Sequence, residues 1–325
     1  MTHGPSHLMV ALADPSARPG PLIARAGEIA RRSGARVTVF HSLYSPFLTG
    51  QQYFSEEELR QTIADAVEAR KAELEVIAQP LRAAGIDVHV RVRWDYPPHE
   101  SIVREVLREK IGLLLVGTHR HSRVARLALT NTDWQLIRSC PCPVLLVKGR
   151  QPYDNAPVLV SVDPMHTNAK PESLDMRLLE AGRDFAKLFG APLHAAHFHS
   201  FGMPVMTGFM VEATPMPQQL SDEYVADVRQ AFRALVKPMG LPNTRQHVRP
   251  GAPVEELPAL ADEIGASVVV MGAVSRSAVK RLFIGNTAES VIDALACDVL
   301  VVKPTDFRTD VPKRTRMRPI VVPAF

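Results

Sequence analysis

Short apolar runs alternate along the chain with longer segments in which apolar residues recur at helical spacing. In the first half this pattern predicts strands at residues 7–13, 35–43, 88–92, 111–116 and 144–147, and helices at residues 21–34, 56–84, 98–110 and 131–140. Strands that alternate with helices predict a parallel sheet, because two parallel strands need a crossover connection that is usually helical. The first half is therefore predicted to be an α/β domain, in which a parallel sheet is covered by helices on both faces.

The same series of elements then occurs a second time. Strands are predicted at residues 157–162, 192–199, 245–248 and 268–271, and helices at residues 174–190, 221–239 and 253–264, with a last helix near Asn286 and a last strand near residues 299–302. At a constant offset of 155 residues, 13 of the 32 pairs between residues 117–148 and residues 272–303 are identical. Agreement of that density without gaps indicates that one fold has been duplicated. Asp14-Pro15 and Asp163-Pro164 end the first strand of each half, at an offset of 149.

Three segments stand outside this repeat. Residues 149–156 contain Gly, Pro, Asp and Asn but little apolar material, so they are interpreted as a linker. Residues 200–219 form a Met-rich irregular segment, which is either a long loop lying across its own domain or a flexible apolar lid or partner surface. Residues 306–325 form a basic, Pro-containing tail. The predicted domains are residues 1–150 and 151–305.

Composition and charge narrow the class of protein. The chain has 325 residues, 46% of them hydrophobic and 22% charged, which suits two globular domains. A formal net charge of +4 is too small to imply nucleic acid by itself. The three cysteines exclude a disulfide framework, and their spacing favours neither a zinc site nor a redox motif. With no apolar run long enough for a membrane span, we expect a cytoplasmic protein without a membrane contact.

The most informative stretch follows the apolar strand at residues 268–271. Gly272 begins a basic loop that ends in Gly285, and a helix begins near Asn286. A helix start offers unpaired backbone N–H groups and a partial positive charge, so a glycine-containing loop that leads into it favours a bound phosphate. Neither glycine carries a Cβ, which lets the backbone approach an anion closely.

This loop resembles that of the universal stress protein family. The nucleotide-binding members have Gly, two residues, Gly, nine residues, Gly and then Ser or Thr; here Gly272, Ser275, Gly285, Asn286 and Thr287 occupy the corresponding region, with Ser275 in place of the second glycine. The runs at residues 285–289 and 297–304 resemble the tandem-domain E-type branch of the family. The resemblance implies two tandem Rossmann-like domains, each a five-stranded parallel sheet with helices on both faces.

It also implies a nucleotide site in the second half, for ATP or AMP, with Mg²⁺ only as the companion of a nucleotide. The candidate contacts carried over from the family are Asp163, Met271, Gly272, Val274, Ser275, Gly285, Asn286, Thr287 and Ala288. An open alternative for Asp163 is a turn former before Pro164. For Asn286 and Thr287 the alternative is an N-cap without a ligand.

The first half lacks this signal. Arg120 and Thr130 stand where the loop pattern has its second and third glycines, so no triphosphate is expected there. The basic group there, comprising His119, Arg120, His121, Arg123 and Arg126, is interpreted as a solvated loop or a weak anion site.

No catalytic constellation or metal site is evident in the sequence, so at most weak ATP hydrolysis is expected. The implied function is stress-response regulation through a small phosphate-bearing ligand; the alternative is an adaptor without nucleotide that acts through a regulatory protein partner or an apolar ligand. We predict no specific nucleic-acid partner. Because family members pair through their last strands, residues 143–147 and 299–302 are expected to form an intramolecular pseudo-dimer, and a homodimer is left open.

Overall fold

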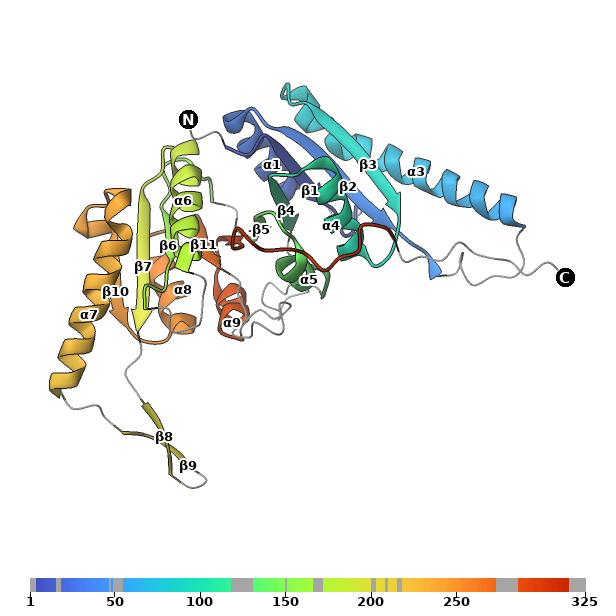
Figure 1. The fold of residues 1–325 in the computed structure, drawn as a ribbon. Helices are drawn as coiled ribbons and strands as arrows, with labels where there is room; N and C mark the ends of the chain where they lie inside the picture. Colours follow the sequence, from blue (N-terminus) through green and yellow to red (C-terminus); the bar gives the residue numbers. More distant parts are fainter. Residues whose placement is uncertain are drawn as a thin grey trace. The chain divides into compact units, whose positions relative to one another are not determined.

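The computed structural model describes residues 4–15, 19–46, 48, 55–117, 131–149, 151–165, 172–199, 203–207, 210–214, 218–272 and 286–315. Two compact units divide between Val147 and Lys148. Unit 1 is the N-terminal half, and the described part of the C-terminal tail from Phe307 onward is assigned to it. Unit 2 is Lys148–Asp306. Each unit is an α/β domain (Figure 1).

Unit 1 is a parallel sheet with the strand order β5-β4-β1-β2-β3. Its strands are β1 (His7–Ala11), β2 (Arg36–Leu43), β3 (Val88–Trp94), β4 (Leu113–Gly117) and β5 (Val144–Val147), and its helices are α1 (Gly20–Ser33), α3 (Glu56–Ala83), α4 (Pro98–Glu109) and α5 (Asn131–Ser139). These elements confirm the predicted α/β fold. Strands β1 and β4 are buried along nearly their whole length, as expected for a sheet that is covered on both faces.

Local sequence signals explain where the helices of unit 1 begin and end. Ser55 and Glu58 form a capping box at the start of α3, in which Ser55 N–H donates to Glu58 Oε2 at 2.8 Å and Ser55 Oγ accepts from Glu58 N–H. Gly34 ends α1 in a left-handed conformation with φ 70°, which only glycine adopts without strain. Where α1 packs against α3, Gly27 lies close to Leu81: a Cβ at Gly27 would be 3.0 Å from Leu81 Cδ2.

Unit 2 repeats the topology with the strand order β12-β11-β6-β7-β10. Its strands in this sheet are β6 (Val158–Ser161), β7 (Leu193–His199), β10 (Gln246–Pro250), β11 (Val268–Gly272) and β12 (Asp298–Val302), and its helices are α6 (Glu172–Leu188), α7 (Gln218–Val236), α8 (Pro253–Glu263) and α9 (Asn286–Ala294). Two short 3₁₀ helices, η1 (Lys237–Met239) and η2 (Asn243–Arg245), lie between α7 and β10. The two halves therefore have one fold, as the repeat predicts.

The segment interpreted as a linker is anchored in the core of unit 2. Tyr153 is fully buried, packs edge-on against Phe185 and Phe189, and donates its hydroxyl to the buried carboxylate of Asp298. Asp298 also accepts the backbone N–H groups of Lys148 and Gly149, at 2.7 and 2.6 Å. The low apolar content of residues 149–156 did not reveal this anchoring, because it depends on one aromatic ring and a carboxylate distant in sequence.

The Met-rich segment is not an irregular loop, which corrects the sequence-based interpretation. It contains β8 (Met203–Thr207) and β9 (Met210–Thr214), which pair antiparallel as a separate two-stranded sheet. This hairpin follows the carboxyl end of β7 (Figure 1). Gly and Pro in the segment suggested a loop. The Met, Val and Thr residues between them are nevertheless compatible with two short paired strands.

The search for membrane spans returned none: within the described part of the chain, every helix is too short or too polar to cross a bilayer.

Candidate functional site

The carboxyl ends of β6 and β11 form the candidate site of unit 2. The strand order reverses between these two neighbours, and ligands of open α/β sheets bind at such a switch point. Val160 of β6 lies opposite Val270 of β11. Asp163 and Gly272 follow within three residues, so the fold brings these two predicted contacts to the same edge of the sheet.

Asp163 is held in position by a second carboxylate. Its side chain is buried, with 7% of its surface exposed, and its backbone N–H donates to Asp175 Oδ1 at 3.1 Å. Asp175 is fully buried in α6. The turn before Pro164 is therefore tied to the first helix of unit 2, and Asp175 is a supporting residue that the sequence pattern did not single out.

Gly272 has a packing reason that is independent of any ligand. A Cβ built at Gly272 would lie 2.9 Å from Leu174 Cδ2 and 3.7 Å from Leu178 Cδ1, both on α6. A side chain at this position would therefore have to displace the end of the Leu174 side chain. The neighbouring Met271 is buried, with 6% of its surface exposed.

The start of α9 lies in the region where a phosphate is predicted. The helix begins at Asn286, Thr287 is exposed and Ala288 is half-buried. Glu289 follows in the first turn, where a carboxylate favours the positive end of the helix. The predicted contacts Val274, Ser275 and Gly285 and the side chain of Asn286 lie outside the described residues.

A histidine beside the switch point was missed by sequence reasoning. His197 of β7 is buried, and its Nδ1 donates to the carbonyl oxygen of Val162, the residue before Asp163, at 3.0 Å. In unit 1, His41 donates in the same way to Leu12 O at 2.8 Å. Burial lowers the pKa of His41, against the opposing effect of this hydrogen bond. An alignment of the two halves would have placed His41 and His197 at equivalent positions and so drawn attention to both.

The equivalent edge of unit 1 differs by one residue. Leu12 N–H donates to Phe40 O, and Val162 N–H donates to Ala196 O, so the strand register relates the two units here by an offset of 150. The sequence match of Asp14 with Asp163 at an offset of 149 is therefore wrong in register, because Ala13 occupies the position of Asp163. Asp14 is exposed. The basic loop of unit 1, with Arg120 and Thr130, lies outside the described residues.

Two further histidines of unit 2 pair between β7 and β10. His194 Nδ1 and His247 Nε2 are 3.0 Å apart, and the rings stack with an angle of 5° between their planes. Burial, followed by the nearby charges of His247 and Arg245, lowers the pKa of His194 to about 4. Burial likewise lowers the pKa of His247. At neutral pH one ring donates and the other accepts.

Within the part of the chain that the structure describes, no three His, Cys, Asp or Glu side chains are grouped to hold a metal ion. Cys140 Sγ and Cys142 Sγ are 3.5 Å apart, and both residues are buried. The hydrogen bond with Cys140, followed by burial, holds the pKa of Cys142 well above its ordinary value, so its thiol stays protonated at neutral pH. These two cysteines act as small core residues.

Comparison with known proteins assigns the family. The sequence profile described as "Universal stress protein family" matches residues 6–148 and again residues 157–303. The chain belongs to the universal stress protein family. It carries two such domains in tandem, which confirms both the resemblance and the duplication.

Full-length relatives share this arrangement. Universal stress protein E of Photorhabdus laumondii is 30% identical over 305 residues, covering 92% of this chain and 95% of the relative. Universal stress protein E of Escherichia coli K12 is 29% identical over 307 residues, covering 93% and 96%. Among solved structures, the protein PA1789 from Pseudomonas aeruginosa PAO1, described as functionally unknown, matches with a TM-score of 0.72 and 26% identity over 94% of this chain and 95% of that protein. The tandem universal stress protein fold thus extends over nearly the whole chain.

Proposed function

We propose that this tandem universal stress protein is a cytoplasmic regulator whose unit 2 binds ATP or AMP, with Mg²⁺ accompanying the nucleotide. The observation that carries the proposal is the switch point of unit 2. There the buried Asp163, held by Asp175, lies at the same edge of the sheet as Gly272. Gly272 begins the loop that leads to the start of α9, as in the family pattern.

The residues at this edge can supply three kinds of contact. The carboxylate of Asp163 is an acceptor for a ribose hydroxyl, and the first N–H groups of α9 are donors for phosphate oxygens. Ser275 and Thr287 add hydroxyls to the loop and to the first turn of α9. The sequence shows no catalytic constellation or metal site, so we propose a receptor rather than an enzyme.

Titration calorimetry with ATP and with AMP, in the presence of Mg²⁺, tests the proposal on the full chain. Gly285→Arg places a long side chain where the loop meets the phosphates and is expected to abolish binding. Thr130→Arg is the matched control at the same loop position of the first half, and it is expected to leave binding unchanged. Equal losses in both variants, or no heat with the unaltered chain, would contradict a nucleotide site in unit 2.

A second candidate function is that of an adaptor without nucleotide. The β8–β9 hairpin favours it, because a separate two-stranded sheet built from a Met-rich segment suits an adaptable partner surface. Deletion of residues 200–219 would then remove a regulatory partner from a native pull-down while ATP binding is unaffected. Phosphate release from ATP no faster than in buffer is expected under both functions.

A further inference from the structure

The outer edge of β3 in unit 1 has backbone groups that no described strand pairs with. Val37 N–H donates to Asp87 O at 2.8 Å, and Asp95 N–H donates to Leu43 O at 3.1 Å. In a parallel pair, alternate residues bond to the neighbouring strand. The odd-numbered residues of β3 therefore bond to β2, and the N–H and C=O groups of Val88, Val90 and Val92 point outward. Val88 O already accepts from Arg82 Nη2 at 3.1 Å, so the open part of the edge is at Val90 and Val92.

Three exposed basic residues line one face of this edge strand. His89, Arg91 and Arg93, called here the β3 basic stripe, alternate with the inward-facing valines and are about 7 Å apart along the strand. Arg91 makes no ion pair with any residue that the structure describes. Arg93 shares the carboxylate of Glu105 with Arg108, so two guanidinium groups face one acid. The stripe keeps a net positive charge.

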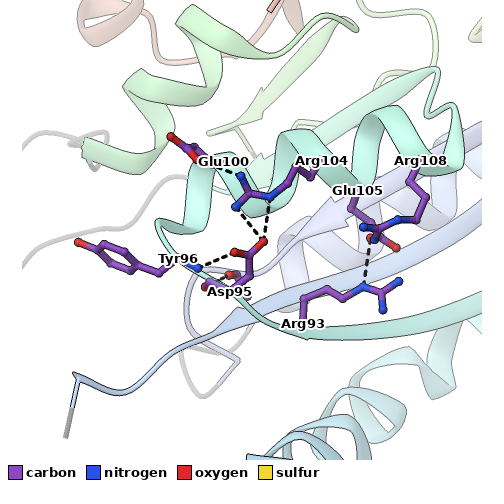
Figure 2. Close-up of polar contacts among 8 residues, drawn as sticks. Arg93, Asp95, Tyr96, Glu100, Arg104, Glu105 and Arg108 are labelled. Atoms are coloured by element: carbon purple, nitrogen blue, oxygen red, sulfur yellow. Dashed lines mark hydrogen bonds and ion pairs between the residues drawn. The ribbon is translucent and has the colours of Figure 1, made fainter. Parts of the chain in front are cut away.

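Helix α4 holds the carboxyl half of β3 in place, as Figure 2 shows. Arg93 Nε lies 3.3 Å from Glu105 Oε2, and the side chain of Glu105 is fully buried. Arg104 Nε donates to Asp95 Oδ2 at 2.9 Å, and Asp95 Oδ1 accepts the N–H of Tyr96 at 2.9 Å. A strand fixed in this way loses little further freedom when another strand binds beside it.

Aromatic rings lie at the carboxyl end of the β3 basic stripe. Tyr44 lies 5.9 Å from Trp94 and 4.6 Å from Tyr96, measured between ring centroids. Half of Tyr96 is exposed, at 51%. A partner strand that runs past Trp94 would meet an apolar surface at this end.

The corresponding edge of unit 2 lacks these properties. Arg249, at the register position of Arg93, is paired with both carboxylate oxygens of Glu263 at 2.7 and 2.8 Å. His247, at the position of Arg91, is bonded to His194. Pro250 occupies an outward position, because the next residue, Gly251, bonds to His199 O, and proline has no N–H to offer. In unit 2 the arginine and histidine of this edge therefore have partners, and the last outward position lacks an N–H group.

We propose that the outer edge of β3 binds an extended acidic segment of a partner protein as an additional strand. Main-chain hydrogen bonds to Val90 and Val92 would give affinity, as in other cases of strand addition. Carboxylates at alternate positions of the partner would face the β3 basic stripe, where opposite charges on neighbouring strands attract. The charge of the stripe selects an acidic partner over a second copy of this basic edge.

Fluorescence anisotropy with a labelled eight-residue peptide of alternating Glu and Val, blocked at both ends, tests this proposal on the full chain. Arg91→Glu is expected to weaken binding about tenfold or more, because it replaces attraction by repulsion. Arg60→Glu, on the exposed face of α3, changes the net charge equally and is the matched control. A peptide of alternating Lys and Val is expected not to bind.

A second pair of variants separates strand addition from general attraction between charges. Val92→Pro removes one outward N–H and is expected to abolish binding, whereas Val92→Thr keeps this group and retains binding. Circular dichroism and thermal unfolding check that each variant is folded. Equal binding by Arg91→Glu and Arg60→Glu would overturn the proposal. The proposal would also be overturned if the chain bound a single-stranded oligonucleotide more tightly than the acidic peptide, and if a folded Val92→Pro variant bound that oligonucleotide equally well.

Discussion

Helices α4 and α8 occupy the same place in the two units, yet they bury opposite kinds of side chain. Each helix precedes the equivalent strand at an offset of 155, and Ile111 N–H bonds to Val106 O as Ala266 N–H bonds to Ala261 O. Where unit 1 buries Arg104 and Glu105, unit 2 has the exposed Ala259 and the fully buried Leu260. The comparison teaches that the fold accepts either a charged or an apolar buried side chain at the position of Glu105, and needs no buried side chain at that of Arg104.

The fold itself therefore does not require the buried charges of unit 1. A buried ion pair is often no more stabilising than the apolar residues that could replace it. In unit 1 buried pairs fix β3, whose edge is open and basic; in unit 2 the equivalent strand β10 is held to α8 by the solvent-accessible pair of Arg249 with Glu263. Unit 2 instead keeps its buried carboxylates, Asp163 and Asp175, at the switch point.

The largest effect is expected from breaking the buried pair of unit 1. Arg104→Ala leaves the buried carboxylate of Asp95 without its cation and should destabilise the chain by about 3–5 kcal/mol in urea unfolding. The double variant Asp95→Ala and Arg104→Ala should lose clearly less than the sum of the two single variants. If the losses simply add, the two residues are not coupled and the contrast with α8 fails.

A smaller effect separates the two strand-end glycines. Gly272→Ala forces a Cβ to within 2.9 Å of Leu174 Cδ2, whereas Gly117→Ala places it at an ordinary 3.4 Å from Leu22 Cδ2. Thermal or urea unfolding should show a loss of about 1–3 kcal/mol for Gly272→Ala and a clearly smaller one for Gly117→Ala. A larger loss for Gly117→Ala than for Gly272→Ala would mean that Leu174 of α6 shifts more easily than Leu22 of α1.

The smallest effect is expected from acid on the His194–His247 pair. The folded pKa of His194, about 4, lies below its unfolded value near 6.5, so its neutral form is favoured by folding. Stability from this group is fully present above pH 6.5 and is lost as the pH falls from 6.5 through about 4. Solvent screens these half-buried rings, which keeps the effect small.

Urea unfolding at pH 7.5, 5.5 and 4.5 measures this loss. His194→Gln should flatten the pH dependence, and His89→Gln, at an exposed histidine of β3, is the control that should not. An unchanged slope in His194→Gln would show that other groups carry the acid sensitivity.

Much of the candidate site could be read from the sequence, because the signals are local. A buried apolar strand, a glycine at its end and a helix start at Asn286 placed the site at the end of β11. Asp163 was predicted as a contact from the resemblance to the family, and its place at the end of β6 from the Asp-Pro pair. His197 and Asp175 were not found, because each acts through a backbone group distant in sequence.

By itself, the sequence determined the α/β fold and the duplication, since apolar periodicity and a gap-free internal match need no three-dimensional information. The family followed from the resemblance of the loop between Gly272 and Thr287. Only the tertiary structure decided which charges are buried and which edge is open. The register shift that moves Asp14 out of the position of Asp163 depends on hydrogen bonds between strands that are about 30 residues apart. The anchoring of Tyr153 on Asp298 joins residues 145 positions apart, and no local pattern specifies such a pair.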